Sequence, residues 1–415
     1  MLAPYDPLKQ YGLDHSSLDL SGRSFLLVTL PFGAFGTALR KALLDIKADR
    51  VDRMIFNGGD ASSWLHKGRV TFRRSAAEWP DFLRRLAEDY TDIIIFGESG
   101  PYNRAVLELA DQISARVWVL ENGYFRPDWI TLERNGVNAT SQLPRDAAGY
   151  GEPVPEIPTS YTVGRILPYH VLNISLYHLM QVLGSAFYPR YSNPYTISIG
   201  QQCWGHIRRY LRMTFRNKAN LDVHELRLKG PYFVICLQRE GDNQLVRYSE
   251  FGDNVSFLRR VLTSFASHAD AGARLVVKNH PLDPGITDFE KVIQEMSNRY
   301  GLKGRVEFWD GGNLAEMCRS SQGMVVNNSS AALSAVGFGT PVKVLGRAFF
   351  DFEGLTDQKS LELFWKSPQS PDPALFKRFR SHVLAKAQIN GNFHEPRSRN
   401  YTARAVAAFL SQRSV

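Results

Sequence analysis

Four short polar motifs carry side chains that can take part in catalysis, and each follows a short apolar run. In chain order they are Glu121-Asn122-Gly123, Gly241-Asp242, Lys278-Asn279-His280-Pro281 and Asn327-Asn328-Ser329-Ser330. Carboxylates serve as nucleophiles or as proton donors and acceptors. An ammonium, an amide and an imidazole together suit a leaving phosphate group. Because ligands bind outside the carboxyl ends of strands in open parallel sheets, these positions predict an active site built from strand ends.

Each of the two carboxylates has a functional and a purely structural interpretation. Glu121 can place its carboxylate in a cleft while Gly123 turns the backbone, or it can be an ordinary surface residue of a turn. Asp242 can attack an anomeric carbon or act as a base, or it can form a turn with Gly241 and Asn243. The residue types leave both alternatives open.

The other two motifs suit a phosphate. Donors of different kinds converge at Lys278, Asn279 and His280, and His280 can stabilise or protonate a leaving phosphate; a structural histidine is the alternative. Ser329 and Ser330 open a helix, whose free N–H groups and dipole attract an anion. Simple helix capping is the alternative for one serine. The doubled Asn-Asn-Ser-Ser at the end of a core strand favours the phosphate site.

The elements that position these motifs follow from hydrophobic periodicity. Short β-branched or aromatic runs alternate with helical patterns, which is typical of βαβ units and predicts parallel sheets covered by helices. The fold class is therefore α/β, with two Rossmann-like domains whose sheets face a central cleft. Strands are expected over residues 25–30, 53–57, 92–96 and 116–120, and again over 232–237, 274–278, 305–309, 323–326 and 341–345.

Composition places the domain boundaries. Residues 1–160 form the predicted N-terminal Rossmann-like domain, and residues 161–228 form a helical insertion that follows the proline-rich segment GEPVPEIPTS. Residues 229–370 form the predicted C-terminal Rossmann-like domain. Residues 371–415 are expected to form helices, the last of which packs back on the first domain.

The insertion has two features that suit contact with a membrane. Residues 166–188 are largely apolar, yet polar residues interrupt them too often for a spanning helix of about 20 apolar residues. Over residues 197–217, Arg208, Arg212 and Arg216 recur at i, i+4 and i+8 and so form a basic stripe on one helix. The alternative is that the apolar residues are core contacts and the arginines form a solvated face.

Composition also narrows the class of protein. With 44% hydrophobic and 22% charged residues, the chain is expected to fold throughout. Cys203, Cys236 and Cys318 are odd in number and lack C-x-x-C spacing, so we expect neither a disulfide framework nor a zinc site. The N-terminus lacks the pattern of a signal peptide. The net charge of +9 suits an anionic partner, but no recognised nucleic-acid motif accompanies it.

In this order, the four motifs resemble those of bacterial glycosyltransferases that use CMP-activated acidic sugars. The similarity is greatest to the capsule-synthesis family of the KpsS type, the β-Kdo transferases. It is carried by ENGYFRPDWITLERNGVNATSQLPRD, LQREGDNQL, VKNHPLDPG and VNNSSAALSAVGFGTPVKVLGRAFFDFEGLT, and more weakly by FNGGDASSW and FGESGPYNRAVLELA. The chain departs from the family at Asn122, where a second acidic residue is usual, and in FGESGPYN, which lacks the usual Arg and His.

The resemblance implies a GT-B-like fold with the acceptor on the N-terminal domain and the donor on the C-terminal one. It also implies a retaining enzyme that transfers Kdo from CMP-β-Kdo to a phosphatidylglycerol-type lipid and so starts the linker of a capsular polysaccharide. Asp242 is then the expected nucleophile, and Glu121 and His280 are the candidates for handling the proton. The resemblance also implies roles in binding. The donor phosphate falls to Lys278, Asn279, His280, Pro281, Asn328, Ser329 and Ser330, the sugar carboxylate to Arg126, Arg239 or Arg247, and the lipid to Arg208, Arg212 and Arg216.

We expect no metal or other cofactor, because these groups would neutralise the leaving CMP. The expected location is cytoplasmic, on the inner face of the cytoplasmic membrane, in company with other capsule enzymes. The competing hypothesis is a non-catalytic component of capsule export or assembly. Such a protein would bind a membrane or partner proteins without transferring a sugar.

Overall fold

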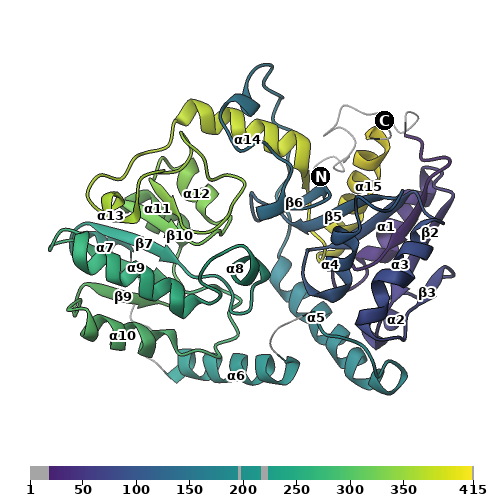
Figure 1. Cartoon of the computed structure of the whole chain (residues 1–415), viewed down its shortest axis with the longest axis horizontal. Helices are drawn as coiled ribbons and strands as arrows, with labels where there is room; N and C mark the ends of the chain where they lie inside the picture. The colour runs from purple at the N-terminus through teal and green to yellow at the C-terminus, as the bar shows by residue number, and fades with distance from the viewer. Residues whose placement is uncertain (1–17, 195–197, 216–222, 414–415) are drawn as a thin grey trace. The chain divides into compact units, whose positions relative to one another are not determined.

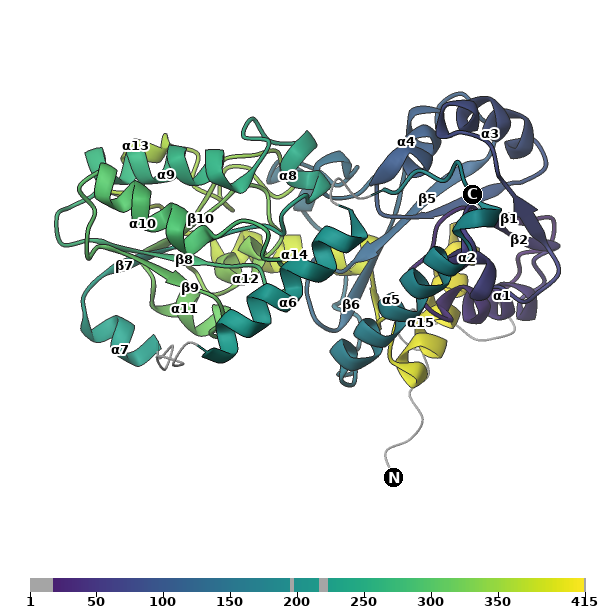
Figure 2. The ribbon, with the colours of Figure 1, turned by 90° about the horizontal axis from the view of Figure 1, so that it is seen from below.

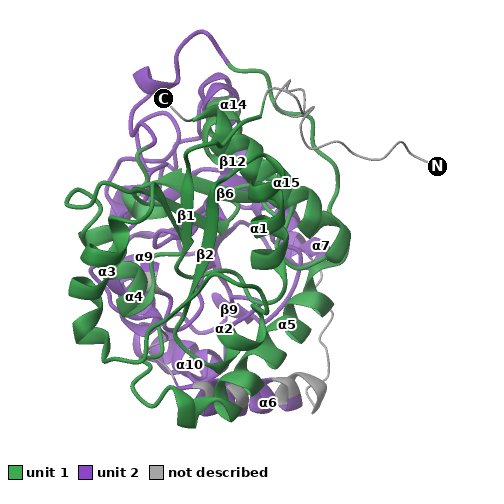
Figure 3. Cartoon of the chain, turned by 90° about the vertical axis from the view of Figure 1, so that its right-hand side faces the viewer, with its two compact units in different colours: residues 1–142, 155–194, 381–415 green, residues 143–154, 195–380 purple. Residues whose placement is uncertain are grey.

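The computed structural model describes residues 18–194, 198–215 and 223–413. The chain divides into two compact units, coloured green and purple in Figure 3. Unit 1 comprises residues 1–142, 155–194 and 381–415, and unit 2 comprises residues 143–154 and 195–380. Each has a sheet of mostly or wholly parallel strands with helices, so the two expected α/β halves are confirmed.

Unit 1 is built on a seven-stranded sheet in the order β12-β6-β5-β4-β1-β2-β3. Strands β1 to β5 run parallel, whereas β6 is antiparallel to β5 and β12 is antiparallel to β6. The sequence patterns miss β3 and β12, which span three residues each, and β6, whose nearly continuous burial hides any alternation. The strands are β1 (Ser24–Leu27), β2 (Arg50–Ile55), β3 (Arg69–Thr71), β4 (Asp92–Phe96), β5 (Arg116–Asn122), β6 (Trp129–Arg134) and β12 (Gln388–Asn390).

Alternation along the strands gives unit 1 two hydrophobic cores, because successive side chains point to opposite faces of a sheet. Phe25 and Leu27 belong to one cluster, together with α1 and α15. Leu26 and Val28 belong to the other, together with α3 and α4. The helices are α1 (Phe35–Asp45), α2 (Gly58–Ser62), α3 (Trp79–Ala87), α4 (Gly100–Glu108), α5 (Ile166–Leu183) and α15 (Pro396–Gln412).

Unit 2 is built on a five-stranded sheet in the order β11-β10-β7-β8-β9, in which every pairing is parallel. All five strands lie where periodicity predicts them, within two residues at each end: β7 (Tyr232–Cys236), β8 (Arg274–Lys278), β9 (Val306–Trp309), β10 (Gly323–Val326) and β11 (Val342–Val344). Figure 2 shows α9 and α10 above this sheet and α11 below it. The helices are α6 (Ile199–Phe215), α7 (Val223–Leu228), α8 (Asn243–Arg247), α9 (Asn254–His268), α10 (Phe289–Arg299), α11 (Leu314–Ser320), α12 (Ala332–Gly337), α13 (Leu361–Phe364) and α14 (Pro373–Ala387).

The division of the chain differs from the predicted one in two places. Residues 161–228 are not a separate insertion, because α5 belongs to unit 1 and α6 and α7 belong to unit 2. Residues 371–415 are also shared, since α14 begins in unit 2 whereas β12 and α15 belong to unit 1. Tertiary pairing explains the second difference: β12 extends the unit 1 sheet and α15 packs against α1. The predicted return of the last helix to the first domain is thereby confirmed.

One side of α5 packs closely against the start of α2, and both Figure 1 and Figure 2 show the two helices side by side. Glycines make this approach feasible: a Cβ atom at Gly58 would lie 2.2 Å from the Met180 carbonyl oxygen, and one at Gly184 would lie 2.7 Å from the Gly58 Cα. Polar contacts fix the pairing, because the Tyr177 hydroxyl donates to Asp60 Oδ1 at 3.1 Å and accepts from Asn57 Nδ2 at 2.8 Å.

The other side of α5 is apolar and exposed. The helix contains no acidic or basic residue apart from two histidines. Leu172, Leu176, Leu179 and Leu183 recur at spacings of four, three and four residues, and each is more than half exposed. Within the part of the chain that the structure describes, no helix is long and apolar enough to cross a membrane.

A pair of histidines connects α5 to the segment before α15. His170 Nδ1 lies 2.9 Å from His394 Nε2, and the Asn173 amide lies 3.3 Å from His394 Nδ1. His394 is buried, and the loop after β1 approaches the same place, because a Cβ atom at Gly33 would lie 2.6 Å from the Asn173 side chain. Burial lowers the pKa of His394 to about 4, and the neighbouring His170 adds to this shift.

This shift predicts a pH-dependent stability. The unfolded chain binds a proton at His394 below a pKa of about 6.5, whereas the folded chain binds it only near pH 4. The stabilising contribution of the neutral ring is therefore complete above about pH 6.5 and is lost as the pH falls towards 4, at up to about 1.4 kcal/mol per pH unit. We expect His394→Asn to weaken the pH dependence of the unfolding free energy between pH 6.5 and 5. Equal pH dependence in wild type, His394→Asn and the control His268→Asn would contradict this.

Candidate active site

The carboxyl edge of the unit 2 sheet collects three of the four predicted motifs. Because all five strands are parallel, their carboxyl ends share one edge. Asp242 lies in the segment after β7, His280 after β8, and Ser329 and Ser330 after β10. Strands β10, β7 and β8 are neighbours in the sheet, so the three motifs come from adjacent positions. Glu121, by contrast, lies in unit 1.

Asp242 has a clear structural role. It is the N-cap of α8, and its Oδ1 accepts a hydrogen bond from the Gln244 N–H at 2.8 Å. This agrees with the turn-forming alternative that the sequence left open. A carboxylate has about four acceptor positions, so the cap occupies only part of its capacity. The role of Asp242 as a nucleophile stays a prediction.

A hydrogen bond to the His280 ring defines which ring nitrogen carries the proton. Nδ1 accepts a hydrogen bond from the Leu282 N–H at 3.1 Å, so the neutral ring has its hydrogen on Nε2. The side chain is half-buried. A neutral His280 is therefore a hydrogen-bond donor at Nε2, which is the form that suits a phosphate oxygen.

Arg209 of α6 holds the loop that carries His280. Its guanidinium group binds Asp310 in bidentate fashion, with Nε 3.0 Å from Oδ2 and Nη2 2.5 Å from Oδ1. The same group donates to the carbonyl oxygens of His280, Pro281 and Asp283 at 3.2, 3.1 and 2.5 Å. Its side chain is only 10% exposed, which makes each of these charge-assisted bonds important. One side chain thus links α6 to the loops after β8 and β9.

Lys278 and Asn279, which precede His280 in its motif, bind groups of the protein itself. Lys278 is buried, and its Nζ donates to the Gly311 carbonyl oxygen at 2.6 Å. Burial lowers its pKa. Asn279 Nδ2 donates to Asp310 Oδ1 at 3.1 Å, and Asn279 Oδ1 accepts from the His280 N–H at 2.9 Å. These contacts give both residues a role in shaping the loop, and their predicted contact with a phosphate stays a prediction.

A buried carboxylate joins the loops after β7 and β8. Asp283 accepts from the Gly285 N–H at 2.8 Å and from the Glu240 N–H at 3.1 Å. Burial raises its pKa, although these two N–H bonds oppose the shift. Glu240 in turn accepts from the Thr287 N–H at 3.2 Å and from the Thr287 hydroxyl. The segments that carry Asp242 and His280 are therefore held together by side-chain bonds.

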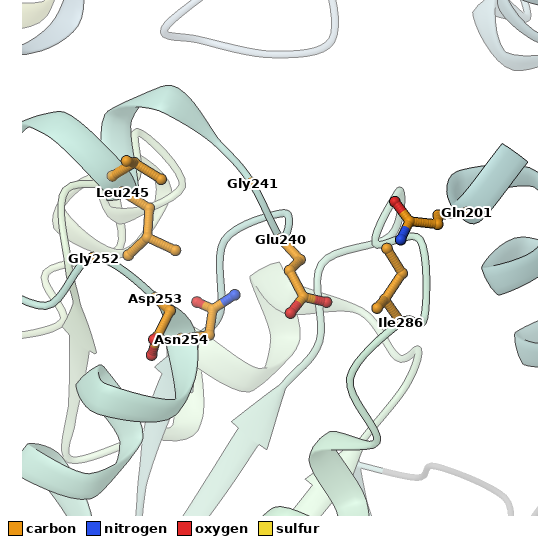
Figure 4. Close-up of a pocket in the computed structure, with 9 residues that line it drawn as sticks. Gln201, Glu240, Gly241, Leu245, Gly252, Asp253, Asn254 and Ile286 are labelled. Atoms are coloured by element: carbon orange, nitrogen blue, oxygen red, sulfur yellow. The ribbon is translucent and has the colours of Figure 1, made fainter. Parts of the chain in front are cut away.

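Residues of these loops line a pocket of about 370 Å³, which is shown in Figure 4. Glu240 lies between Asn254 and Ile286 in this view, and Gln201 of α6 lies on the far side of Ile286. Asp253 also lines the pocket, where it caps α9 by accepting from the Ser256 N–H at 2.6 Å. Two carboxylates make this pocket a poor place for a phosphate.

Some polar groups of the Asn327–Ser330 motif form structural hydrogen bonds, whereas others, such as the Asn328 Oδ1, have no hydrogen-bond partner among the described residues. Asn328 Nδ2 donates to the carbonyl oxygens of Gln244 and Tyr248, at 2.8 and 3.2 Å, and so holds α8 over the end of β10. Ser329 Oγ accepts from the Ala331 N–H at 3.3 Å. Ser329 and Ser330 are both half-buried. Their predicted contact with phosphate stays a prediction.

In unit 1, Glu121 is part of a strand and does not follow one. Strand β5 continues through Asn122 because β6 pairs with it as a hairpin, with Glu121 opposite Thr131. Glu121 Oε1 accepts from the Asn122 N–H at 2.8 Å. A Cβ atom at Gly97 would lie 3.1 Å from Glu121 Oε2, and the φ angle of +67° also favours glycine there. The carboxylate therefore lies against the end of β4.

Two further carboxylates support the Glu121 hairpin, and neither belongs to the motifs that the sequence predicts. Glu98 is buried and accepts from the Val137 N–H at 3.0 Å. Glu133 accepts from the Tyr124 hydroxyl, at the base of the loop between β5 and β6. Burial raises the pKa of Glu133 to about 7; the hydrogen bonds from Ser141 and Tyr124 oppose this shift, and nearby Glu98 adds to it.

The six arginines with predicted roles have different surroundings. Arg126 is exposed and its Nε donates to the Gly123 carbonyl oxygen at 3.1 Å; Arg239 donates to the Gln202 side chain; Arg247 is exposed beside the Tyr248 ring. Arg208 Nη2 donates to the Gly285 and Ile286 carbonyl oxygens, both at 2.6 Å, so it faces the protein. The Arg212 side chain and all of Arg216 lie outside the described residues. A lipid-binding stripe stays a prediction.

The residues that organise the unit 2 site are partly absent from the predicted set. Arg209 is next to Arg208 of the predicted basic stripe, but nothing in the local sequence distinguishes it from the other arginines of α6. Asp310 follows the strand predicted over 305–309, so the rule that finds the four motifs also applies to it. In the described segments, no group of three or more His, Cys, Asp or Glu residues is arranged to hold a metal.

The bonds of Arg209 predict that Arg209→Lys loosens the His280 loop, because an ammonium cannot form the bidentate pair and reach three carbonyl oxygens. Breaking a buried pair costs about 3 kcal/mol, which corresponds to roughly hundredfold faster local opening. Hydrogen exchange of the amides over 283–287 measures this, with exposed Arg259→Lys as the matched control. Unchanged exchange in Arg209→Lys would contradict the bracing role.

Sequence comparisons with known proteins all lead to proteins of capsule polysaccharides. The family model described as "Capsule polysaccharide biosynthesis protein" matches residues 91–394. The capsule polysaccharide export protein KpsS of Escherichia coli is 32% identical over 387 residues, which cover 90% of this chain and 98% of the relative. The capsule polysaccharide modification protein LipB of Neisseria meningitidis serogroup B is 32% identical over 393 residues, which cover 90% and 92%.

Among solved structures, the β-Kdo 2,7 transferase of Thermosulfurimonas dismutans KpsC matches with a TM-score of 0.40 and 14% identity, over 88% of this chain and 89% of that chain. The family match carries the assignment, because it covers well over half of the chain and includes all four motifs. The chain belongs to the capsule polysaccharide biosynthesis protein family.

Proposed function

We propose that this protein is a retaining glycosyltransferase that transfers Kdo from CMP-β-Kdo to a phosphatidylglycerol-type lipid and so starts the linker of a capsular polysaccharide. One observation carries the proposal: the segments with Asp242, His280 and Ser329 leave adjacent parallel strands at one edge of unit 2. A carboxylate between two candidate phosphate-binding elements suits displacement of a phosphate from an anomeric carbon.

We assign binding of the leaving CMP to the segments after β8 and β10, whose strands flank the strand that precedes Asp242. His280 offers a neutral N–H donor at Nε2, because its Nδ1 accepts from the Leu282 N–H. Ser329 and Ser330 offer hydroxyl groups at the end of β10. These donors would stabilise the negative charge of the departing CMP without a metal ion. Lys278 is left out of this assignment, since its Nζ is bound to the Gly311 carbonyl oxygen.

Retention of configuration needs two displacements or a front-face route, and we propose the two displacements. In the first, a carboxylate oxygen of Asp242 forms a bond to the anomeric carbon while the bond from that carbon to the phosphate oxygen breaks and CMP leaves. In the second, the acceptor hydroxyl displaces Asp242 and gives its proton to a general base. The N-cap bond to the Gln244 N–H would hold Asp242 in one orientation during both steps.

A pair of substitutions separates the capping role of Asp242 from the chemical one. Asparagine caps a helix about as well as aspartate, whereas alanine does not. We therefore expect Asp242→Asn to keep the wild-type melting temperature and to lose at least about a thousandfold in kcat, and Asp242→Ala to lose stability as well. The assay is transfer from CMP-β-Kdo, made in situ, to a fluorescent phosphatidylglycerol, followed by mass spectrometry.

The outcomes of this assay discriminate between hypotheses. Near wild-type activity in Asp242→Asn would reduce Asp242 to a helix cap. No product with the wild type, together with no thermal stabilisation by CMP, would favour the second candidate function, a non-catalytic export component. That candidate is supported by the name of the Escherichia coli relative, a capsule polysaccharide export protein.

We further propose that the protein works in the cytoplasm, on the inner face of the cytoplasmic membrane, where a lipid acceptor is present. The exposed side of α5 supports this proposal. Its exposed leucines run from Leu172 to Leu183, and the exposed Arg165 directly precedes the helix. A helix that combines exposed apolar side chains with a basic residue at one end suits an anionic membrane surface.

Membrane binding through α5 predicts a specific sensitivity. We expect the double substitution Leu176→Gln and Leu179→Gln to weaken binding to vesicles that contain phosphatidylglycerol by at least tenfold, because both side chains are exposed on the same side of α5. Co-sedimentation measures this. The matched control is Leu363→Gln, an equally exposed leucine of unit 2. If the double variant and the control bind alike, α5 is not the membrane contact.

A further inference from the structure

One edge of unit 1 is strongly basic, and the proposed reaction gives it no role. Strand β3 is the last strand of the unit 1 sheet, beside β2 (Figure 1). Residues 65–74, which include β3, contain four basic residues and one histidine but no acidic residue. These four are all exposed: Lys67, Arg69, Arg73 and Arg74. Together with the exposed Arg190 we call them the basic edge.

Arg190 comes from a distant part of the chain but lies near the other four. The Arg73 Cζ atom is 5.5 Å from the centroid of the Tyr188 ring, and Tyr188 precedes Arg190 by two residues. Arg69 Nη2 donates to the Ala61 carbonyl oxygen at 3.0 Å, which ties β3 to α2. The C-terminal end of α5 packs on the start of the same helix. The basic edge therefore lies next to the C-terminal end of α5.

The acidic residues on either side of this run do not neutralise it. Asp60 is buried and pairs with Arg53, with 3.1 Å between Oδ1 and Nη2. Glu78 accepts from the Ser75 N–H and hydroxyl at 3.0 and 2.8 Å. These two bonds lower the pKa of Glu78 most, and two cations of the basic edge add to the shift. One exposed carboxylate is thus set against five cations, so the surface stays positive.

Protection of an edge strand accounts for only part of this charge. Basic residues on an edge strand prevent it from pairing with strands of other chains. Since β3 spans only Arg69–Thr71, this reason covers its first residue and the adjacent Lys67. Arg73, Arg74 and Arg190 lie outside the strand. Their clustering suits a binding partner with negative charge.

Exposed apolar side chains accompany the charges and narrow the class of partner. Leu65 is 85% exposed and directly precedes the basic run, and Leu183 and Phe187, at the C-terminal end of α5, are 64% and 67% exposed. An oligonucleotide or an acidic peptide would match the charges but leave these apolar groups in water. A bilayer with anionic headgroups matches both, because apolar side chains enter the interface while cations attract lipid phosphates.

We propose that the basic edge binds the headgroups of an anionic bilayer, while Leu65, Leu183 and Phe187 enter the interface beside it. The apolar part rests on the proposed membrane contact of α5. The selection of anionic over zwitterionic lipid rests on the basic edge alone. Since the proposed acceptor is itself an anionic lipid, this contact would draw the enzyme to membrane that contains its substrate.

Co-sedimentation with two kinds of vesicle tests this contact: phosphatidylcholine alone, and equal parts of phosphatidylcholine and phosphatidylglycerol. A basic residue beside an anionic surface contributes about fivefold in affinity. We expect Arg73→Gln with Arg74→Gln to weaken binding to the anionic vesicles roughly tenfold or more and to leave binding to the neutral ones unchanged. The matched control is Arg259→Gln with Arg260→Gln, an adjacent exposed pair on α9 of unit 2 with the same change in net charge.

Arg190→Gln is the second variant, because it removes a charge of the basic edge from a different segment. We expect it to weaken binding to the anionic vesicles about fivefold. The preference of the wild type for these vesicles should disappear at about 1 M salt, where the Debye length is about 3 Å. All the substituted arginines are exposed, so every variant should keep the wild-type melting temperature.

Unchanged binding to anionic vesicles in both variants would overturn the role of the basic edge, as would equal binding of the wild type to both kinds of vesicle. Either result leaves the α5 contact intact. Binding to neither kind would overturn both contacts, and the transfer assay with a detergent-dispersed acceptor decides the proposed reaction separately. A random oligonucleotide that binds more tightly than the anionic vesicles, and does so through Arg73 and Arg74, would assign this surface to another polyanion and overturn the proposal.

Discussion

The bidentate pair between Arg209 and Asp310 is the interaction on which the unit 2 site depends most directly. Through it, α6 holds the loops after β8 and β9, and the remaining N–H groups of Arg209 bind three carbonyl oxygens of the His280 loop. A largely buried guanidinium group without these partners would cost several kcal/mol. The helix and the two loops are therefore stable only together. His280 is positioned by Arg209, which has no role in the proposed reaction itself.

Several polar residues at this edge combine a structural bond with a predicted chemical role. Asp242 caps α8, and Asn328 binds the carbonyl oxygens of the same short helix. These roles are compatible, because carboxylates and amides have more hydrogen-bonding positions than one contact uses. A side chain that is already held by the fold loses little conformational freedom when a substrate binds. Structural bonds of this kind prepare a site for catalysis as much as they stabilise the fold.

In unit 1, an apolar helix is fixed by polar contacts and glycines. Tyr177 bonds Asp60, His170 contacts His394, and Gly58 lets the backbones of α2 and α5 approach closely. These contacts use one side of α5 and leave its leucines exposed on the other. Exposed apolar surface of this extent is costly in water, which is the physical reason to expect a further contact there.

The sequence by itself determined the motifs and most of the elements, but not β3, β6 and β12. Strand runs, alternation and the position of polar motifs after strands are local properties. They therefore predict the five strands of unit 2 and the sheet edge from which the segments of Asp242, His280 and Ser329 leave. Only the tertiary structure decided which side chains support that edge. Arg209 and Asp310 are 101 residues apart, and β12 spans three residues far from its partner β6. Contacts between distant segments leave no period in the sequence, because each depends on how the whole chain folds.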